Sequence, residues 1–102
     1  MIAGFSIVPI GVGEELKEHI AGLVPILEAS GLPYVMGAMQ TTIEGDADHV
    51  MATILACHRH MRSAAARVLT QITIDDRAGA TGRLTGKVRD VESVLGREVN
   101  HV

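Results

Sequence analysis

The stretch that decides the fold is residues 2–11, IAGFSIVPIG. Its apolar residues Phe5 and Ile7 alternate with small ones, which is the period-two pattern of a strand that buries one face. We therefore expect Phe5 and Ile7 to point into a core. Gly4 and Ser6 then leave a shallow polar surface on the opposite face of the same strand.

The composition predicts a small protein with an aliphatic core. The chain has 102 residues and is 47% hydrophobic, yet it contains one Phe, one Tyr and no Trp. We expect residues 1–102 to form a single domain, because single cores typically span about 100–200 residues. The net charge of −3 and the few aromatic residues argue against nucleic acid, whose binding needs a basic face or stacking platforms.

The sequence also predicts the cellular compartment of the protein. No apolar run approaches the ~20 residues that span a membrane, and no charged and apolar leader precedes the first strand. The single cysteine, Cys57, excludes an intramolecular disulfide and fits a reducing compartment. We therefore expect a cytoplasmic protein with no membrane partner and no nucleic acid partner.

The first half of the chain predicts one helix and two short strands after the opening strand. An apolar stripe indicates a helix from Glu14 to Ser30, with Pro25 as a kink inside it. Residues 34–45 are long for one strand and contain Gly37. We therefore expect two short strands that are joined by a tight turn or bulge near Met39–Gln40.

The second half predicts a helix, a long strand and a final helix. The helix is expected over 46–66, with its first residue, an aspartate, as the N-cap. The segment 67–77, RVLTQITIDDR, alternates as a strand does. A loop over 78–85 then leads to a short helix that Thr85 caps and Gly96 ends.

This order of elements, β-α-β-β-α-β-α, predicts a ferredoxin-like α+β fold with an extra C-terminal helix. Right-handed crossovers place both long helices on one face of an antiparallel four-stranded sheet. The other face is too apolar to remain in water, so we expect a second copy of the chain to cover it. Its expected residues are Gly4, Ser6, Val8, Val35, Met39, Leu69 and Gln71.

Several conspicuous residues favour structural roles. His58 and His60 lie about 200° apart around a helix, whereas two histidines that hold one metal ion from a helix need i, i+4 spacing. Asp75 and Asp76 are neighbours on a strand and point to opposite faces. No nucleophile–base pair and no ligand cluster emerges, so we predict no catalysis, no metal and no cofactor.

A group of polar residues does suggest a binding site. Strand parity places them together on the helix-free face, provided that the hairpin register turns its polar residues outward. A carboxylate beside hydroxyls, shielded by an apposed subunit, can hold an amino-heterocycle by paired hydrogen bonds and favours a cation. Strand alternation alone is also compatible with a second interpretation, in which these polar residues form the rim of a contact between two subunits. The residues are Ser6, Thr42, Glu44, Thr73 and Asp75.

Four features taken in order resemble the small YkoF-like thiamine-binding family. They are IAGFSIVPIGVG at the start, TTIEG before the second long helix, Cys57-His58 within it, and RVLTQITIDDR followed by LTGKV. The match runs from Met1 to about Leu95. No single motif is diagnostic, and the resemblance rests on the order and spacing of the four motifs. The resemblance implies a ferredoxin-like fold and a tetramer formed by sheet-to-sheet packing. It also implies that thiamine or its hydroxymethyl-pyrimidine moiety binds between subunits on the sheet face.

The resemblance also bears on individual residues. Gly37 stands where relatives often carry His, Gln40 where Gly is usual, and Thr73 where Lys or Arg is frequent. These departures imply a smaller and less basic pocket. Of the family's recurrent polar positions, this chain keeps Ser6, Thr41, Glu44 and Asp75.

The sequence therefore predicts a non-catalytic binding protein for thiamine or a pyrimidine precursor, assembled as a homo-oligomer and most simply as a tetramer. Glu44 is expected to accept from the aminopyrimidine, so its loss should abolish binding and leave the fold intact. The alternative is an oligomeric interaction or regulatory module with no thiamine-related ligand. The candidate ligand-binding residues are Ser6, Thr41, Thr42, Glu44, Thr73 and Asp75.

Overall fold

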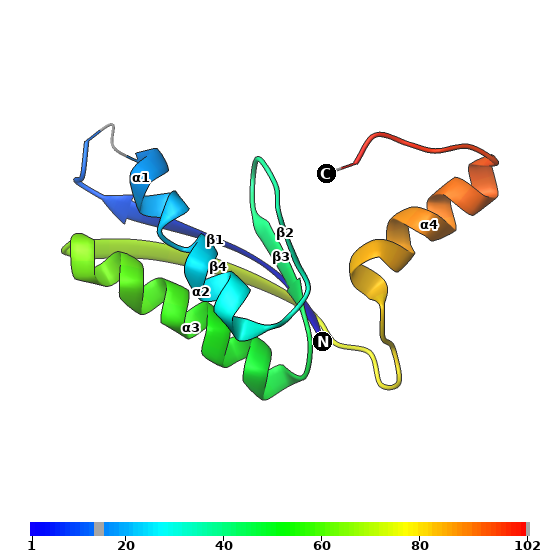
Figure 1. Cartoon of the computed structure of the whole chain (residues 1–102), viewed down its shortest axis with the longest axis horizontal. Coiled ribbons are helices and arrows are strands. Elements are labelled where there is room, and N and C mark those ends of the chain that lie inside the picture. Colours follow the sequence, from blue (N-terminus) through cyan, green and yellow to red (C-terminus); the bar gives the residue numbers. More distant parts are fainter. Residues whose placement is uncertain (14–15, 102) are drawn as a thin grey trace.

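The computed structural model describes residues 1–13 and 16–101 (Figure 1). The expected start of the first helix at Glu14 and Glu15 lies outside these residues. The order of the described elements agrees with the predicted α+β arrangement. The elements are β1 (Ile2–Ile10), α1 (Leu16–Ala21), α2 (Val24–Ser30), β2 (Tyr34–Met36), β3 (Thr41–Glu44), α3 (Ala47–Ala64), β4 (Arg67–Asp75) and α4 (Arg83–Leu95).

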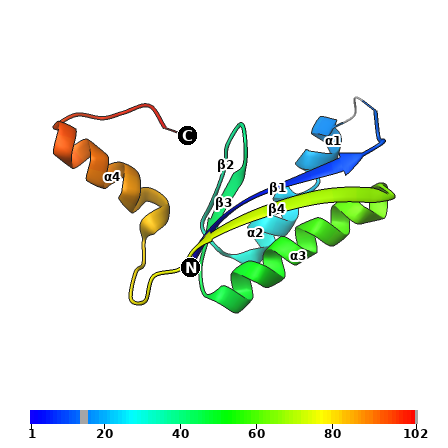
Figure 2. The same cartoon turned by 180° about the vertical axis from the view of Figure 1, so that it is seen from behind.

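The strands form one sheet with the order β2-β3-β1-β4, in which every pair of neighbours is antiparallel. β1 pairs with β4 along its whole length, from Ile2 to Ile10, and with β3 over Ile2–Phe5. Figure 2 shows β4 beside β1, with β4 as the last strand of the sheet. This topology confirms the ferredoxin-like fold, with the opening stretch as an interior strand.

The core lies between the sheet and the helices α1, α2 and α3, which share one face (Figure 1). From the sheet, Phe5, Ile7 and Ile43 are buried there, as the alternation in β1 predicted. The predicted stripe of the long helix α3 is also buried, because its members recur every three or four residues and face one side. The stripe consists of Val50, Ile54, Cys57 and Met61.

The first helical segment is two helices rather than one kinked helix. α1 ends at Ala21 and α2 begins at Val24, so that Pro25 occupies the second position of α2. A proline in the first turn of a helix loses no intrahelical hydrogen bond, because the first amides have no partner within the helix. The proline that appeared to interrupt one helix therefore starts the next.

β4 is an edge strand, and its helix-facing side is only partly covered. Ile72 and Ile74 face the same side as the buried residues of β1, because they pair with Phe5 and Ala3. Both are nevertheless exposed. An open apolar groove of about 430 Å³ separates this part of β4 from α3. The alternation correctly predicted which side chains of β4 point to the helix-covered side of the sheet, but it did not predict how far the helices reach across that side.

α4 lies on the other side of the sheet from α1, α2 and α3, near the chain's N-terminus (Figures 1 and 2). It begins at Arg83, directly after Gly82, so the expected cap at Thr85 is wrong and that residue lies inside the helix. Gly96 ends the helix in a left-handed conformation with φ of 73°, as predicted. We call the sheet face opposite α1, α2 and α3 the free face, and α4 stands over one end of it.

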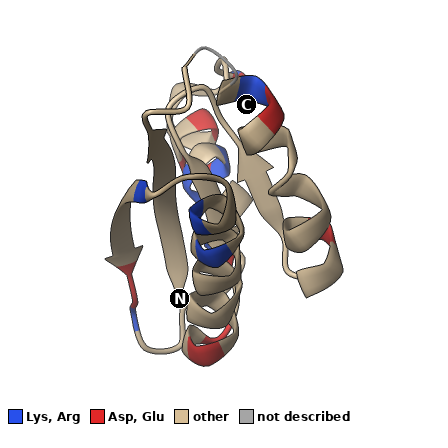
Figure 3. Cartoon of the chain, turned by 90° about the vertical axis from the view of Figure 1, so that its left-hand side faces the viewer, with Lys and Arg blue, Asp and Glu red and all other residues tan. Residues whose placement is uncertain are grey.

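Two further features concern possible partners. Figure 3 shows Lys and Arg distributed over several elements rather than gathered on one surface, which agrees with the absence of a basic face in the sequence. Among the described residues, no helix combines the length and the apolar character needed to cross a bilayer.

We predict that Ile43→Ala destabilises the protein by about 2–5 kcal/mol, because Ile43 is fully buried in the core and the substitution leaves a cavity. Urea unfolding followed by circular dichroism measures the change. Val94→Ala, at a position of α4 that is 87% exposed, is the control and should shift the free energy of unfolding by less than about 0.5 kcal/mol. Equal effects in both variants would contradict this assignment of the core.

Candidate ligand-binding site

The strand register aligns the predicted site residues in rows across the free face. Directly opposed residues of neighbouring strands point to the same face of a sheet. Ile2 lies opposite both Glu44 and Asp75, which forms one row across β3, β1 and β4. The next row joins Thr42, Gly4 and Thr73, and Ser6 pairs with Gln71 one row further on. The predicted parity of Ser6, Thr42, Glu44, Thr73 and Asp75 is therefore present in the structure.

Thr41 does not join these residues. It pairs with Phe5 on one side and with Met36 on the other, so it belongs to the face that the helices cover. It is also buried there. Because side chains alternate along a strand, only one of two adjacent threonines can reach the free face, and that residue is Thr42.

Glu44 is bound by the first turn of α4. Its Oε2 accepts from the Arg83 amide at 2.9 Å, and its Oε1 accepts from the Leu84 amide at 3.0 Å. The residue is only 9% exposed. α4 has no side-chain cap of its own, because Gly82 precedes it. The carboxylate therefore satisfies amides that lack intrahelical partners and lies at the positive end of the helix dipole.

This contact changes the expectation for Glu44. The sequence predicted a carboxylate that accepts from the ligand and whose loss would leave the fold intact. In the structure both of its oxygens bind the amides of Arg83 and Leu84, so Glu44 has a structural role in holding α4 against the sheet.

Asp75 makes the second polar link between the sheet and α4. Its Oδ2 accepts from Lys87 Nζ at 2.6 Å, and the pair is exposed. This hydrogen bond, with the nearby positive charge of Lys87, lowers the pKa of Asp75 below its ordinary 3.8. The ion pair between Asp75 and Lys87 is therefore present at neutral pH. It is lost only in acid, as the pH falls through the lowered pKa of Asp75 in the folded protein.

A groove of about 320 Å³ separates the free face from α4. Thr42, Thr73 and Asp75 line it from the sheet, together with Gly4 and Gln40. The Gln40 carboxamide lies directly over Gly4, because a Cβ at that glycine would come within 2.7 Å of Gln40 Oε1. Any larger residue in place of Gly4 would displace this side chain from the floor of the groove.

The other wall of the groove comes from α4, which sequence reasoning did not include in the site. It contributes Arg83, Leu84, Lys87 and Val88. The available signal was the LTGKV segment, in which Leu84 and Val88 are four residues apart and so share one side of a helix. Arg83 and Lys87 thus bring two positive charges to this wall of the groove.

Ser6 lies outside this groove. It lines a separate cavity of about 150 Å³ between β1, α1 and the turn that joins β2 to β3. Gly37 and Gln40 line the same cavity. The structure thus brings Thr42, Thr73 and Asp75 together in one groove and places Ser6 beside a neighbouring one.

The cysteine and the histidine beside it belong to the core side of the molecule. Cys57 is fully buried, and burial raises the pKa of its thiol to about 11. At neutral pH it is therefore a thiol and not a nucleophilic thiolate. His58 Nδ1 lies 2.6 Å from Thr70 Oγ1, which links α3 to the edge strand β4.

The fold and the groove define a ferredoxin-like protein with a polar site of ligand size beside its sheet. Residues 3–92 match the family of thiamine-binding proteins, and the chain belongs to that family. This finding confirms the resemblance carried by the sequence motifs.

Relatives of this chain occur in several bacteria. A UPF0045 protein of Mycobacterium bovis is 38% identical over 98 residues, which cover 95% of this chain and 96% of the relative. A UPF0045 protein of Synechocystis is 32% identical over 96 residues, which cover 93% of this chain and 79% of the relative.

Solved structures share the fold. A hypothetical protein of Methanocaldococcus jannaschii superposes with a TM-score of 0.81 at 23% identity, covering 88% of this chain and 93% of that one. A Thermotoga maritima protein, named as a candidate for thiamine biosynthesis or salvage, superposes with a TM-score of 0.77 at 26% identity. That match covers 88% of this chain and 96% of the Thermotoga chain.

We predict that Glu44→Gln loosens the start of α4, because an amide side chain offers one acceptor oxygen where the carboxylate offers two. Hydrogen exchange of the Arg83 and Leu84 amides should become faster by about tenfold or more, since a hydrogen bond to a charged group contributes roughly 1.5–3 kcal/mol. Glu28→Gln, on the exposed side of α2, is the control and should leave these amides unchanged. Unchanged exchange in Glu44→Gln would show that this carboxylate does not hold the helix.

Proposed function

We propose that the groove between the free face and α4 binds thiamine or its hydroxymethyl-pyrimidine moiety without catalysing a reaction. The observation that carries this proposal is the convergence of Thr42 from β3 with Thr73 and Asp75 from β4 on one groove of about 320 Å³. That volume lies within the range of small-molecule sites, roughly 300–1,000 Å³. Membership in the thiamine-binding family supports the same ligand class.

The groove has the composition that a planar amino-heterocycle requires. Ile2, Leu84 and Val88 offer aliphatic surface to the faces of a ring. The Thr42 and Thr73 hydroxyls and the Gln40 carboxamide provide donors and acceptors for its edge. A site with mostly apolar walls and few polar groups orients its ligand through those groups.

The two carboxylates have different roles in this proposal. Asp75 faces the groove and is ionised at neutral pH, as an aspartate with an ordinary or lowered pKa is, so it can accept from the pyrimidine amino group and favour the thiazolium charge. Glu44 is bound to the amides of α4 and acts on the ligand by fixing that wall of the groove.

A binding role agrees with the chemistry of the groove. Among the described residues that line it there is no Cys and no His, the side chains most often used as nucleophile and general base. The buried thiol of Cys57, with its raised pKa, lies on the other side of the sheet. The groove thus offers recognition groups without an activated nucleophile.

We also propose that the remainder of the free face is an interface between copies of this chain in a homotetramer. Val8 and Leu69 are directly opposed on this face, beyond the end that α4 covers. Both are exposed, Leu69 to 51%. Adjacent exposed apolar side chains on a sheet favour burial against a second sheet of the same kind.

We predict that Asp75→Asn weakens thiamine binding by about one to two decades, because a charge-assisted hydrogen bond contributes roughly 1.5–3 kcal/mol. Thr73→Val, which removes one hydroxyl from the groove, should weaken binding less. Calorimetric titration with thiamine and with hydroxymethyl-pyrimidine measures both effects.

The matched control is Asp48→Asn, which makes the same charge change in the first turn of α3, away from the groove. It should bind as the wild type does. Equal affinity in Asp75→Asn and Asp48→Asn would place the ligand elsewhere, and no heat with either compound in the wild type would overturn the proposed function.

We predict that Leu69→Asp splits the tetramer, because a charge buried at an interface without a partner costs several kcal/mol. Sedimentation velocity at micromolar concentration measures the assembly. Leu55→Asp is the control, since Leu55 is 44% exposed on α3, on the helix-covered side of the sheet. A monomeric wild type, or a tetramer that persists in Leu69→Asp, would contradict the proposed interface.

A further inference from the structure

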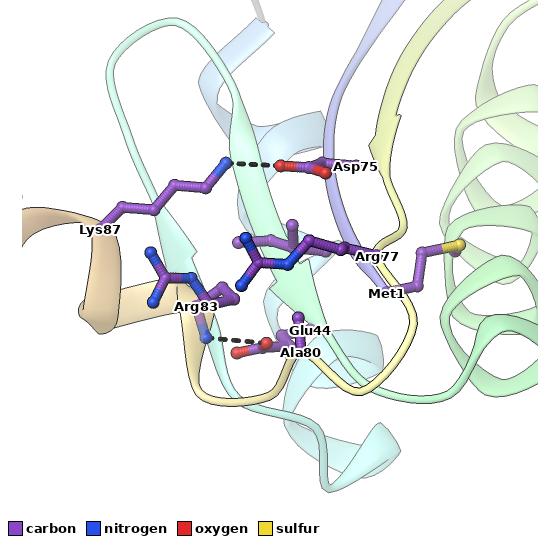
Figure 4. Close-up of a pocket in the computed structure, with 8 residues that line it drawn as sticks. Met1, Glu44, Asp75, Arg77, Ala80, Arg83 and Lys87 are labelled. Atoms are coloured by element: carbon purple, nitrogen blue, oxygen red, sulfur yellow. Dashed lines mark hydrogen bonds and ion pairs between the residues drawn. The ribbon is translucent and has the colours of Figure 1, made fainter.

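A small pocket beside the groove collects more cations than carboxylates. It has a volume of about 80 Å³ and lies between the ends of β3 and β4 and the start of α4 (Figure 4). Arg77, Arg83 and Lys87 bring three positive charges, against two negative charges from Glu44 and Asp75. These side chains therefore carry an excess of one positive charge.

The partners of these groups leave Arg77 available. Glu44 is bound by the amides of α4, and Lys87 donates to Asp75. The Arg83 guanidinium pairs with a carboxylate further along its own helix. Within residues 1–13 and 16–101, the Arg77 guanidinium makes neither a hydrogen bond nor an ion pair. Arg77 is one of the positive charges that lower the pKa of Asp75, but among the described residues it is the lining cation without a direct side-chain partner.

The geometry directs this charge into the pocket. Figure 4 shows the Arg77 side chain extending from the end of β4 toward α4, while Lys87 reaches back from α4 to Asp75. The opening amides of α4 are already bound by Glu44, so the helix end offsets the charge of that carboxylate. A small anion placed in the pocket therefore meets the Arg77 guanidinium and the Lys87 ammonium group.

The pocket and the groove are neighbouring parts of one site. They share Ile2, Asp75, Arg83 and Lys87. At about 30 Å³ per water molecule, a volume of about 80 Å³ has room for two or three waters. That space fits a tetrahedral anionic group better than a second ring. A ligand whose ring lies in the groove can therefore extend a small anionic substituent toward Arg77.

We propose that Arg77 and Lys87 form a subsite for the phosphate group of a phosphorylated thiamine-type ligand. This inference rests on the proposed function of the groove, and it specifies that the preferred ligand is the phosphate ester. Arg77 supplies a planar fork of donors that matches two phosphate oxygens, and Lys87 adds a point charge. A phosphate monoester carries about −1.5 to −2 charges at neutral pH, so it gains from both groups.

Calorimetric titration of the wild type with thiamine, thiamine monophosphate and inorganic phosphate tests the subsite. We expect the monophosphate to bind about tenfold or more tightly than thiamine, since one charge-assisted contact accounts for a factor of this size. Inorganic phosphate should compete with the monophosphate and leave thiamine binding unchanged. The preference should also decrease as salt is raised, because exposed charges are screened.

Arg77→Gln should abolish the preference for the monophosphate and keep the affinity for thiamine. Arg59→Gln, at an exposed position of α3, removes the same charge far from the pocket and should keep the preference. Equal affinity of the wild type for thiamine and its monophosphate, or a preference that persists in Arg77→Gln, would overturn the subsite while leaving thiamine binding in place. If neither thiamine nor its monophosphate binds, the proposed function fails together with the subsite.

Discussion

The contact between the Glu44 carboxylate and the first amides of α4 determines how the site is built. Glu44 ends β3 on the free face, and α4 begins 39 residues later at Arg83, the nearer of its two hydrogen-bond partners. A helix start has amides without intrahelical partners, and a buried carboxylate needs donors. Each group satisfies the other. The helix is thereby fixed over one end of the sheet, although none of its own residues is buried.

This constraint creates the groove and sets its electrostatics. Without α4 the free face would be an open sheet, since Gly4 has no side chain and Thr42 and Thr73 are short. With α4 in place, Leu84 and Val88 form an apolar wall and Lys87 reaches Asp75. Because the helix end offsets the charge of Glu44, Asp75 is the carboxylate that lines the groove, and three cations face two carboxylates in the adjoining pocket.

The two ends of the free face differ because β1 pairs with its neighbours unequally. β4 accompanies β1 from Ile2 to Ile10, whereas β3 reaches only Phe5. The polar rows therefore lie where three strands and α4 meet, and the apolar pair Val8 and Leu69 lies beyond them. One strand thus contributes both to the groove beside α4 and to the exposed apolar pair beyond it.

The sequence by itself determined the helices and strands and the side of each that faces the core, because alternation and helical periodicity are local properties. Phe5 and Ile7 predicted the buried side of β1, and the stripe of α3 predicted the other half of the core. Parity also placed Thr42, Thr73 and Asp75 on one face. Only the tertiary structure decided that Glu44 binds α4 and that Arg77 and Lys87 line one pocket. These facts depend on strand register and on contacts between residues far apart in the chain, which a local pattern does not specify.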